Sequence, residues 1–116
     1  MSTAPVLLPK IRSDALTASA RGQPCALRLP GVRSFDSATT VLAHLPGVGK
    51  GVATKVSDLH ACFACHRCHD VLDRRHWTRH GQTDSQVADA CLRALSETQA
   101  RWVQMGLISV RGGRIL

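Results

Sequence analysis

The sequence predicts a small α+β domain in which a β-hairpin and a helix surround a metal ion, with further helices on both sides. Two short apolar segments with strand character precede a segment with helical periodicity, and Cys, His and Asp residues concentrate where they meet. Aromatic residues are scarce, with two Phe, two Trp and no Tyr, so a bound metal would help to stabilise the core. The chain has 116 residues, the size of one domain. We expect a disordered tail over residues 1–10 and a single domain over residues 11–116.

The first half of the chain supplies the predicted hairpin. Ser is a favourable N-cap, so we expect a short helix from Ser13 to Ala20. Cys25–Leu29 alternates like a strand, and Thr40–Leu45 and Leu59–Ala64 are apolar strand candidates. The glycine-rich segment between the last two predicts a basic loop that carries Lys50 and Lys55.

The second half of the chain is predicted to be helical. One helix should begin near His66 and end at Gly81, and a longer one should begin at a cap formed by Asp84 or Ser85. An apolar stripe at helical spacing predicts the buried face of the longer helix: Val87, Cys91, Leu95, Thr98, Trp102 and Met105. The segment Leu107–Leu116 is predicted to form a small hairpin about two glycines.

The charge of the chain indicates a polyanionic partner. The formal net charge is +7, and twelve of the fifteen basic residues are Arg, whose planar guanidinium matches phosphate oxygens. We therefore expect the protein to bind nucleic acid. The first ten residues are too short and too proline-broken for a signal peptide, which favours a cytoplasmic protein with reduced or metal-bound cysteines.

Metal-ligating side chains gather between Asp58 and Asp73. Cys65 and Cys68 have the C-x-x-C spacing that lets two thiolates bind one zinc ion from the start of a helix. His69 and Asp73 are four residues apart, so they share a helix face and can both point at a second ion.

Three functions are compatible with this cluster. Cys65, Cys68 and His69 form C-x-x-C-H, the attachment motif of a c-type haem. The same cysteines would also serve a non-catalytic zinc module that binds nucleic acid or protein. The third function is a nuclease.

The nuclease interpretation rests on a resemblance. A strand that ends in His44, a loop, Asp58 and a helix opened by the C-x-x-C-H motif occur in an order that resembles the HNH endonucleases, a β-β-α finger wrapped on a metal. More narrowly, the chain resembles the phage and prophage YbcO-like nucleases from about Ile11 to Gly106. The motifs that carry this resemblance are Ala20-Arg-Gly-x-x-Cys25, Leu29-Pro-Gly-Val32, Val41-Leu-Ala-His44, Ala64-Cys-x-x-Cys-His-Asp70 and Asp73-Arg-Arg75.

The resemblance implies roles for individual residues. It implies a metal-dependent endonuclease that hydrolyses DNA, with a treble-clef-like core. His44 would be the general base, Asp58 would orient it where HNH proteins often have Asn, and His69 would bind the catalytic Mg²⁺, Mn²⁺ or Zn²⁺. The basic residues near the site would bind phosphate. These are Lys50, Lys55, Arg67, Arg74 and Arg75.

The chain departs from the family pattern at two positions. Many HNH proteins have an Asp ligand directly before the first His, where this chain has Ala43, so we take Asp73 as the second cation ligand. A structural zinc in such folds is often held by four Cys. Cys25, Cys65 and Cys68 match three of them, and Arg33 stands where the fourth is expected. The zinc would be lost or completed by Cys62, a His or water.

Overall fold

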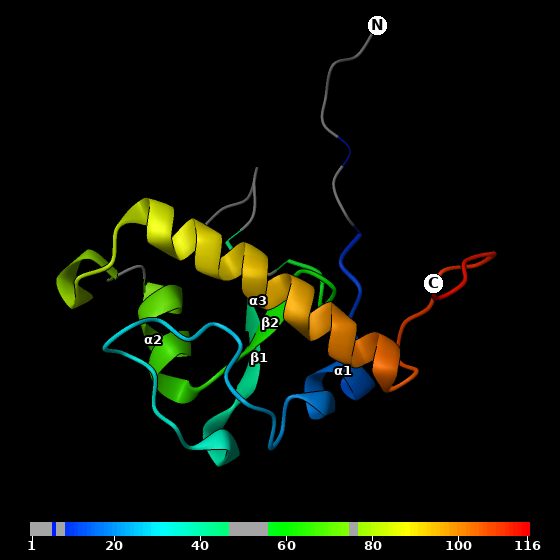
Figure 1. The fold of residues 1–116 in the computed structure, drawn as a ribbon, viewed down its shortest axis with the longest axis horizontal. Helices are drawn as coiled ribbons and strands as arrows, with labels where there is room; N and C mark the ends of the chain where they lie inside the picture. Colours follow the sequence, from blue (N-terminus) through cyan, green and yellow to red (C-terminus); the bar gives the residue numbers. More distant parts are fainter. Residues whose placement is uncertain (1–5, 7–8, 47–55, 75–76) are drawn as a thin grey trace, which may run out of the picture.

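The computed structural model describes residue 6 and residues 9–46, 56–74 and 77–116, and most of the predicted tail and basic loop lie outside these ranges (Figure 1). The helices are α1 (Asp14–Ser19), α2 (His66–Arg74) and α3 (Asp84–Gln104), and the strands are β1 (Val41–His44) and β2 (Ala61–Ala64). Two short 3-10 turns cover Ser37–Thr39 and Trp77–His80. The order of the elements confirms the predicted α+β fold.

The centre of the fold is the hairpin of β1 and β2. The strands are antiparallel, with Leu42 opposite Phe63 and His44 opposite Ala61. Every residue of β2 is buried, so this strand is in the core rather than at a solvated edge. Because α2 begins only two residues after β2 ends, the three elements form the predicted β-β-α unit.

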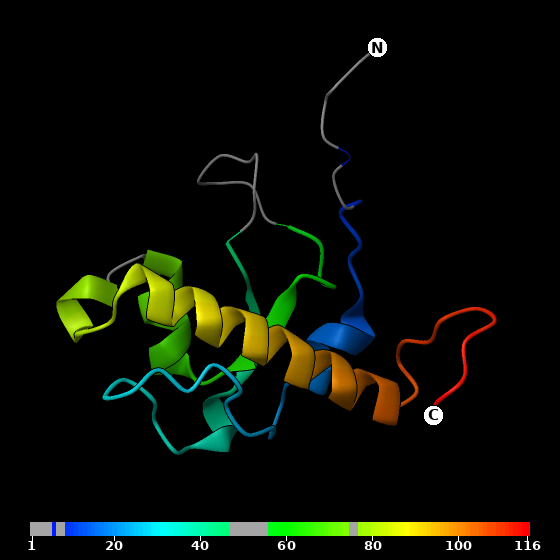
Figure 2. The same ribbon diagram turned by 45° about the horizontal axis from the view of Figure 1, so that its top comes forward.

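Helix α3 crosses the molecule and packs on β2, and α1 lies near its C-terminal end (Figures 1 and 2). The rings of Phe63 and Trp102 meet edge to face with centroids 6.2 Å apart. The buried hydroxyl of Thr98 accepts a hydrogen bond from the backbone N–H of Phe63 at 3.0 Å. Trp102 Nε1 donates to Ser19 Oγ at 2.8 Å, which joins α3 to α1. These contacts place the long helix against the strand that leads into the candidate site.

The segment from Cys25 to Leu29 differs from its prediction, because it does not form a strand. Ala26 donates one backbone hydrogen bond to Phe63 at 2.8 Å, but Arg28 has a φ of +43°, which breaks an extended conformation. The predicted helix to Gly81 also ends earlier, at Arg74. The short helix after Ser13 is confirmed, with the Ser13 side chain accepting from the N–H of Leu16.

The ends of α3 also correct the predictions. Its N-cap is Thr83 rather than Asp84 or Ser85, and Thr83 and Gln86 form a reciprocal capping box. Met105 is 41% exposed at the C-cap, so it is not part of the buried stripe. The segment Leu107–Leu116 has no strands and contains one turn, in which Gly113 N–H donates to Val110 at 2.9 Å. None of the described helices is long and apolar enough to cross a membrane.

Candidate active site and metal centre

His44 and Asp58 form the first part of the candidate site. His44 ends β1 with its side chain 26% exposed, and its Nε2 lies 2.7 Å from Oδ1 of the buried Asp58. The other carboxylate oxygen of Asp58, Oδ2, accepts the backbone N–H of Ser13 at 2.7 Å, and Nη1 of Arg12 lies 3.6 Å from Oδ1. The N-terminus of α1 therefore fixes the Asp58 carboxylate, which in turn orients the His44 imidazole.

The charge state of Asp58 fixes the tautomer of His44. Burial raises the pKa of Asp58, but hydrogen bonds from His44 and from the Ser13 N–H, together with the positive charge of Arg12, outweigh it and leave the pKa below its usual value. An ionised carboxylate only accepts hydrogen bonds, so Nε2 of neutral His44 carries the proton. Nδ1 is then the basic nitrogen, and within the described ranges no residue donates a hydrogen bond to it.

His69 and Asp73 lie one turn apart on α2. His69 is half-buried and Asp73 is exposed. Within the described part of the chain, neither residue belongs to a group of three potential metal ligands whose ligand atoms lie within 4.8 Å of one another. Their shared role as cation ligands therefore stays a prediction.

Cys25, Cys65 and Cys68 come together as one cluster. Their Sγ atoms all lie within 4.8 Å of one another, and the residues are 8%, 1% and 0% exposed. A tetrahedral zinc with Zn–S bonds of about 2.3 Å needs sulfurs about 3.8 Å apart, which is compatible with this grouping. The cluster joins the segment after α1 to the first turn of α2.

Backbone N–H groups from residues 28–34 surround these sulfurs. Such bonds stabilise thiolates and orient metal ligands. The donor and acceptor pairs are Arg28 N to Cys25 Sγ at 3.4 Å, Leu29 N to Cys68 Sγ at 3.4 Å, and Ser34 N to Cys65 Sγ at 3.3 Å. The hydrogen bond between Cys68 and Cys25 lowers the pKa of Cys25 to about 5 and, together with burial, raises the pKa of Cys68, so the two thiols share one proton when no metal is bound. The backbone N–H groups favour thiolates at all three sulfurs, which suits a cation ligand set.

A fourth protein ligand is missing from the described ranges. No other Cys, His, Asp or Glu within them places a ligand atom within 4.8 Å of all three sulfurs. Cys62, one of the predicted replacements, is buried on β2 opposite Ala43 and lies outside the cluster. The Arg33 guanidinium lies 4.0 Å above the centre of the Phe35 ring.

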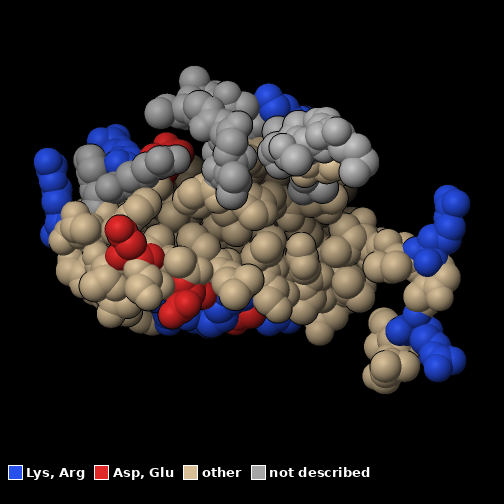
Figure 3. Space-filling view, turned by 90° about the horizontal axis from the view of Figure 1, so that it is seen from above, with Lys and Arg blue, Asp and Glu red and all other residues tan. Residues whose placement is uncertain are grey.

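The predicted phosphate-binding residues are only partly described. Arg67 and Arg74 are exposed on α2, and Arg74 forms a solvent-exposed ion pair with Asp70 at 2.8 Å. Lys50, Lys55 and Arg75 lie outside the described residues. On the face shown in Figure 3, Lys and Arg side chains form separate groups rather than one continuous patch.

Sequence reasoning missed the residues that support the site. Ser13 was expected only to cap a helix, yet its N–H also fixes Asp58 from 45 positions away. Arg28 forms a bidentate pair with Glu97 of α3 at 2.9 Å and so fastens the cysteine-bearing segment to that helix. Neither contact has a local sequence signal.

Comparison with known proteins assigns the chain to a family. The sequence model of a family described as "Putative nuclease YbcO" matches residues 14–107. The chain belongs to this family. The YbcO proteins of Escherichia coli K12 and of Enterobacteria phage 82, each named a putative nuclease, are both 38% identical over 94 residues. That alignment covers 80% of this chain and 95% of each relative.

A solved structure has a similar fold. It is titled "Structure of a putative bacteriophage protein from Escherichia coli str. K-12 substr. MG1655" and is 35% identical, with a TM-score of 0.60. The alignment covers 78% of this chain and 98% of that one. The family match therefore covers most of the chain, in a range that contains His44, Asp58 and the three cysteines.

Proposed function

We propose that the protein is a metal-dependent endonuclease that hydrolyses phosphodiester bonds in DNA. The observation that carries this proposal is the His44–Asp58 pair, in which a buried carboxylate orients a partly exposed imidazole at 2.7 Å. Membership of a family described as nucleases supports the same reaction class. A site of this kind needs both a group that accepts a proton and charges that hold phosphate.

His44 acts as the general base. Its Nδ1 takes a proton from a water molecule while the water oxygen attacks phosphorus and the leaving oxygen departs. The resulting imidazolium is stabilised by the Asp58 carboxylate, which keeps the ring in place throughout. The Ser13 N–H holds the other oxygen of that carboxylate and the Arg12 guanidinium lies near the His44-bound oxygen, so the base stays oriented without substrate.

His69 and Asp73 of α2 would bind the catalytic cation, which is Mg²⁺, Mn²⁺ or Zn²⁺. Such a cation, when bound, stabilises negative charge on the phosphate and on the leaving oxygen. The residues share a helix face one turn apart, which suits two ligands of one ion. Lys50, Lys55, Arg67, Arg74 and Arg75 would hold the DNA backbone.

The three cysteines would hold a structural zinc. The donor set is all sulfur, which zinc favours, and it connects the segment after α1 to the start of α2. The ion would fix the start of α2, and with it the position of His69.

A non-catalytic zinc module that binds nucleic acid or protein is the second candidate. The observation that favours it is the cysteine cluster, which needs no reaction to explain it. The third possibility, a c-type cytochrome, is disfavoured because Cys65 and Cys68 are 1% and 0% exposed and converge on Cys25. Thioether bonds to haem would require both thiols at a pocket large enough for the porphyrin.

Cutting assays separate these functions. Supercoiled plasmid and single-stranded RNA are incubated with purified protein and Mg²⁺ or Mn²⁺, with a chelator as the blank. The endonuclease proposal expects relaxed or linear DNA only when a cation is present. A protein that binds DNA and zinc but leaves the plasmid intact with every cation would be the zinc module.

A further inference from the structure

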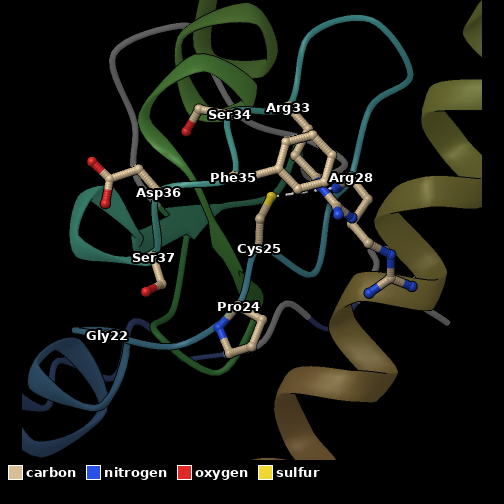
Figure 4. A pocket seen from close by; sticks show the side chains of 9 residues that line it. All are labelled: Gly22, Pro24, Cys25, Arg28, Arg33, Ser34, Phe35, Asp36 and Ser37. Atoms are coloured by element: carbon tan, nitrogen blue, oxygen red, sulfur yellow. Dashed lines mark hydrogen bonds between the residues drawn. The ribbon is translucent and has the colours of Figure 1, made fainter.

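A cavity of about 330 Å³ lies beside Cys25, between the segment that carries the cysteine and residues 33–37 (Figure 4). Arg28, Arg33 and Phe35 are among the side chains that line it. Of the three clustered cysteines, only Cys25 lines the cavity, and it is also the most exposed of them at 8%. The cavity is therefore the accessible side of the metal centre.

The other sides of the cluster are closed by protein. Leu29 and Ser34 direct backbone N–H groups onto the sulfurs of Cys68 and Cys65, which are buried. A tetrahedral ion on three thiolates has one further position, and within the described ranges no side chain fills it. Sites with three protein ligands take their fourth ligand from solution.

Arg33 stands at the edge of this open side. The N–H of the next residue, Ser34, binds Cys65, while the Arg33 guanidinium lies over the Phe35 ring. Within the described ranges no carboxylate lies within 4.0 Å of the Arg33 guanidinium, whereas Arg28 is engaged by Glu97. The nearby Asp36 carboxylate points away from Cys25 in Figure 4. The Arg33 guanidinium, a planar cation, thus lines the cavity onto which the open coordination position of the metal would face.

We propose that the metal centre takes its fourth ligand from this cavity, and that the ligand is a small thiol that carries a carboxylate. The thiol releases its proton to solvent and binds the ion as a thiolate in place of water, and Arg33 binds the carboxylate. A soft, sulfur-rich site favours a thiolate as its fourth ligand. The inference rests on the proposed structural metal but not on nuclease activity.

The test replaces zinc with Co²⁺, whose visible spectrum reports the number of thiolate ligands. Adding 3-mercaptopropionate to the cobalt protein should increase the thiolate-to-cobalt charge-transfer band saturably, beyond a blank of cobalt and thiol alone. 2-Mercaptoethanol should bind about tenfold more weakly because it lacks the carboxylate. In Arg33→Gln the two thiols should bind equally.

Arg33→Cys provides the matched control for an open position. Its cobalt spectrum should already show four thiolates and should not change with added thiol. The proposal fails if the parent shows four thiolates before any thiol is added, ignores both thiols, or binds no stoichiometric cobalt. Equal affinity of the parent for both thiols would remove the role of Arg33. If Arg33→Cys folds poorly, thiol binding by the parent and by Arg33→Gln still tests the proposal. None of these measurements depends on DNA cutting.

Discussion

Asp58 accepts a hydrogen bond from His44 Nε2 at 2.7 Å, and this contact joins the end of β1 to the segment that precedes β2. The same carboxylate accepts the N–H of Ser13, the N-cap of α1. The proposed base is therefore positioned by two segments that lie far apart in the sequence.

Asp58→Asn should reduce the loss of stability in acid. The folded-state pKa of Asp58 lies below its unfolded value, so its stabilisation is complete above the unfolded pKa of about 4 and is lost as the pH falls toward the folded value. Melting temperatures of parent and variant from pH 2 to 6 measure this. We expect the parent to lose more stability than Asp58→Asn below about pH 4. If the melting temperatures of parent and variant changed equally with pH, the ionised carboxylate would not be stabilised in the folded protein.

The cysteine cluster should bind zinc tightly and support folding. Protein purified without added metal should contain one zinc, and a strong chelator should lower its melting temperature, because metal binding is coupled to folding. Cys68→Ala should lose the metal and much of the folded state. Cys91→Ala is the matched control, since Cys91 lies on α3 outside the cluster, and it should keep the zinc. Melting that is unaffected by chelation would contradict the structural role.

His69→Ala should need more cation for the same cutting rate. The variant loses a predicted ligand but keeps the general base, so its activity should rise with Mg²⁺ or Mn²⁺ concentration and should not recover at higher pH. Asp73→Asn should shift the cation requirement in the same direction. Asp70→Asn is the control, because Asp70 is an exposed carboxylate on the same helix and pairs with Arg74. This variant should leave the cation requirement unchanged. An unaltered cation dependence of His69→Ala would exclude it as a ligand.

Binding to DNA should weaken steeply as salt rises. Each phosphate contact releases counterions, so Arg67→Gln and Arg74→Gln should each lower the slope of log affinity against log salt by about 0.9. Arg111→Gln removes the same charge from the exposed segment after α3, outside the matched residues 14–107, and should change little. Fluorescence anisotropy with a labelled duplex gives the slopes. Equal slopes for all three variants and the parent would place the DNA elsewhere.

The local features of the fold were predictable because they depend on neighbouring residues. Ser13 marked the first helix, and the apolar runs marked both strands of the hairpin. The cap of α3 was also within reach, because Thr83 and Gln86 have the spacing of a capping box. Asp84 and Ser85 follow directly and are also favourable N-caps, so cap preference alone does not fix the first residue of the helix.

Long-range contacts explain what the sequence did not predict. Cys25–Leu29 alternates like a strand, but the backbone N–H groups of Arg28 and Leu29 donate to sulfurs of the cluster instead of to a neighbouring strand. The attachment of Asp58 to Ser13 and of Arg28 to Glu97 joins residues 45 and 69 positions apart. Periodicity carries no information about such pairs. The resemblance to a known family supplied the candidate roles of His44 and Cys25, whereas the C-x-x-C spacing alone indicated Cys65 and Cys68.

His44 is the proposed general base, and the proposed reaction cannot proceed at its normal rate without it. His44→Ala removes the proton acceptor but leaves the proposed cation ligands and phosphate contacts, so it should bind DNA and cation like the parent. Loss of a general base typically lowers the rate by about 10²–10⁴, with partial recovery at higher pH as hydroxide becomes available. His80→Ala, which removes an exposed imidazole outside the site, should cut at the parent rate.

The most direct measurement is the initial rate of plasmid cutting by the parent, His44→Ala and His80→Ala at saturating Mg²⁺ or Mn²⁺. Zinc content and melting temperature are measured on the same preparations to show that all three are folded. We expect cation-dependent cutting by the parent and His80→Ala, and a rate at least about a hundredfold lower for His44→Ala. A folded His44→Ala that cuts at the parent rate, or a parent that cuts with no cation, would contradict the account.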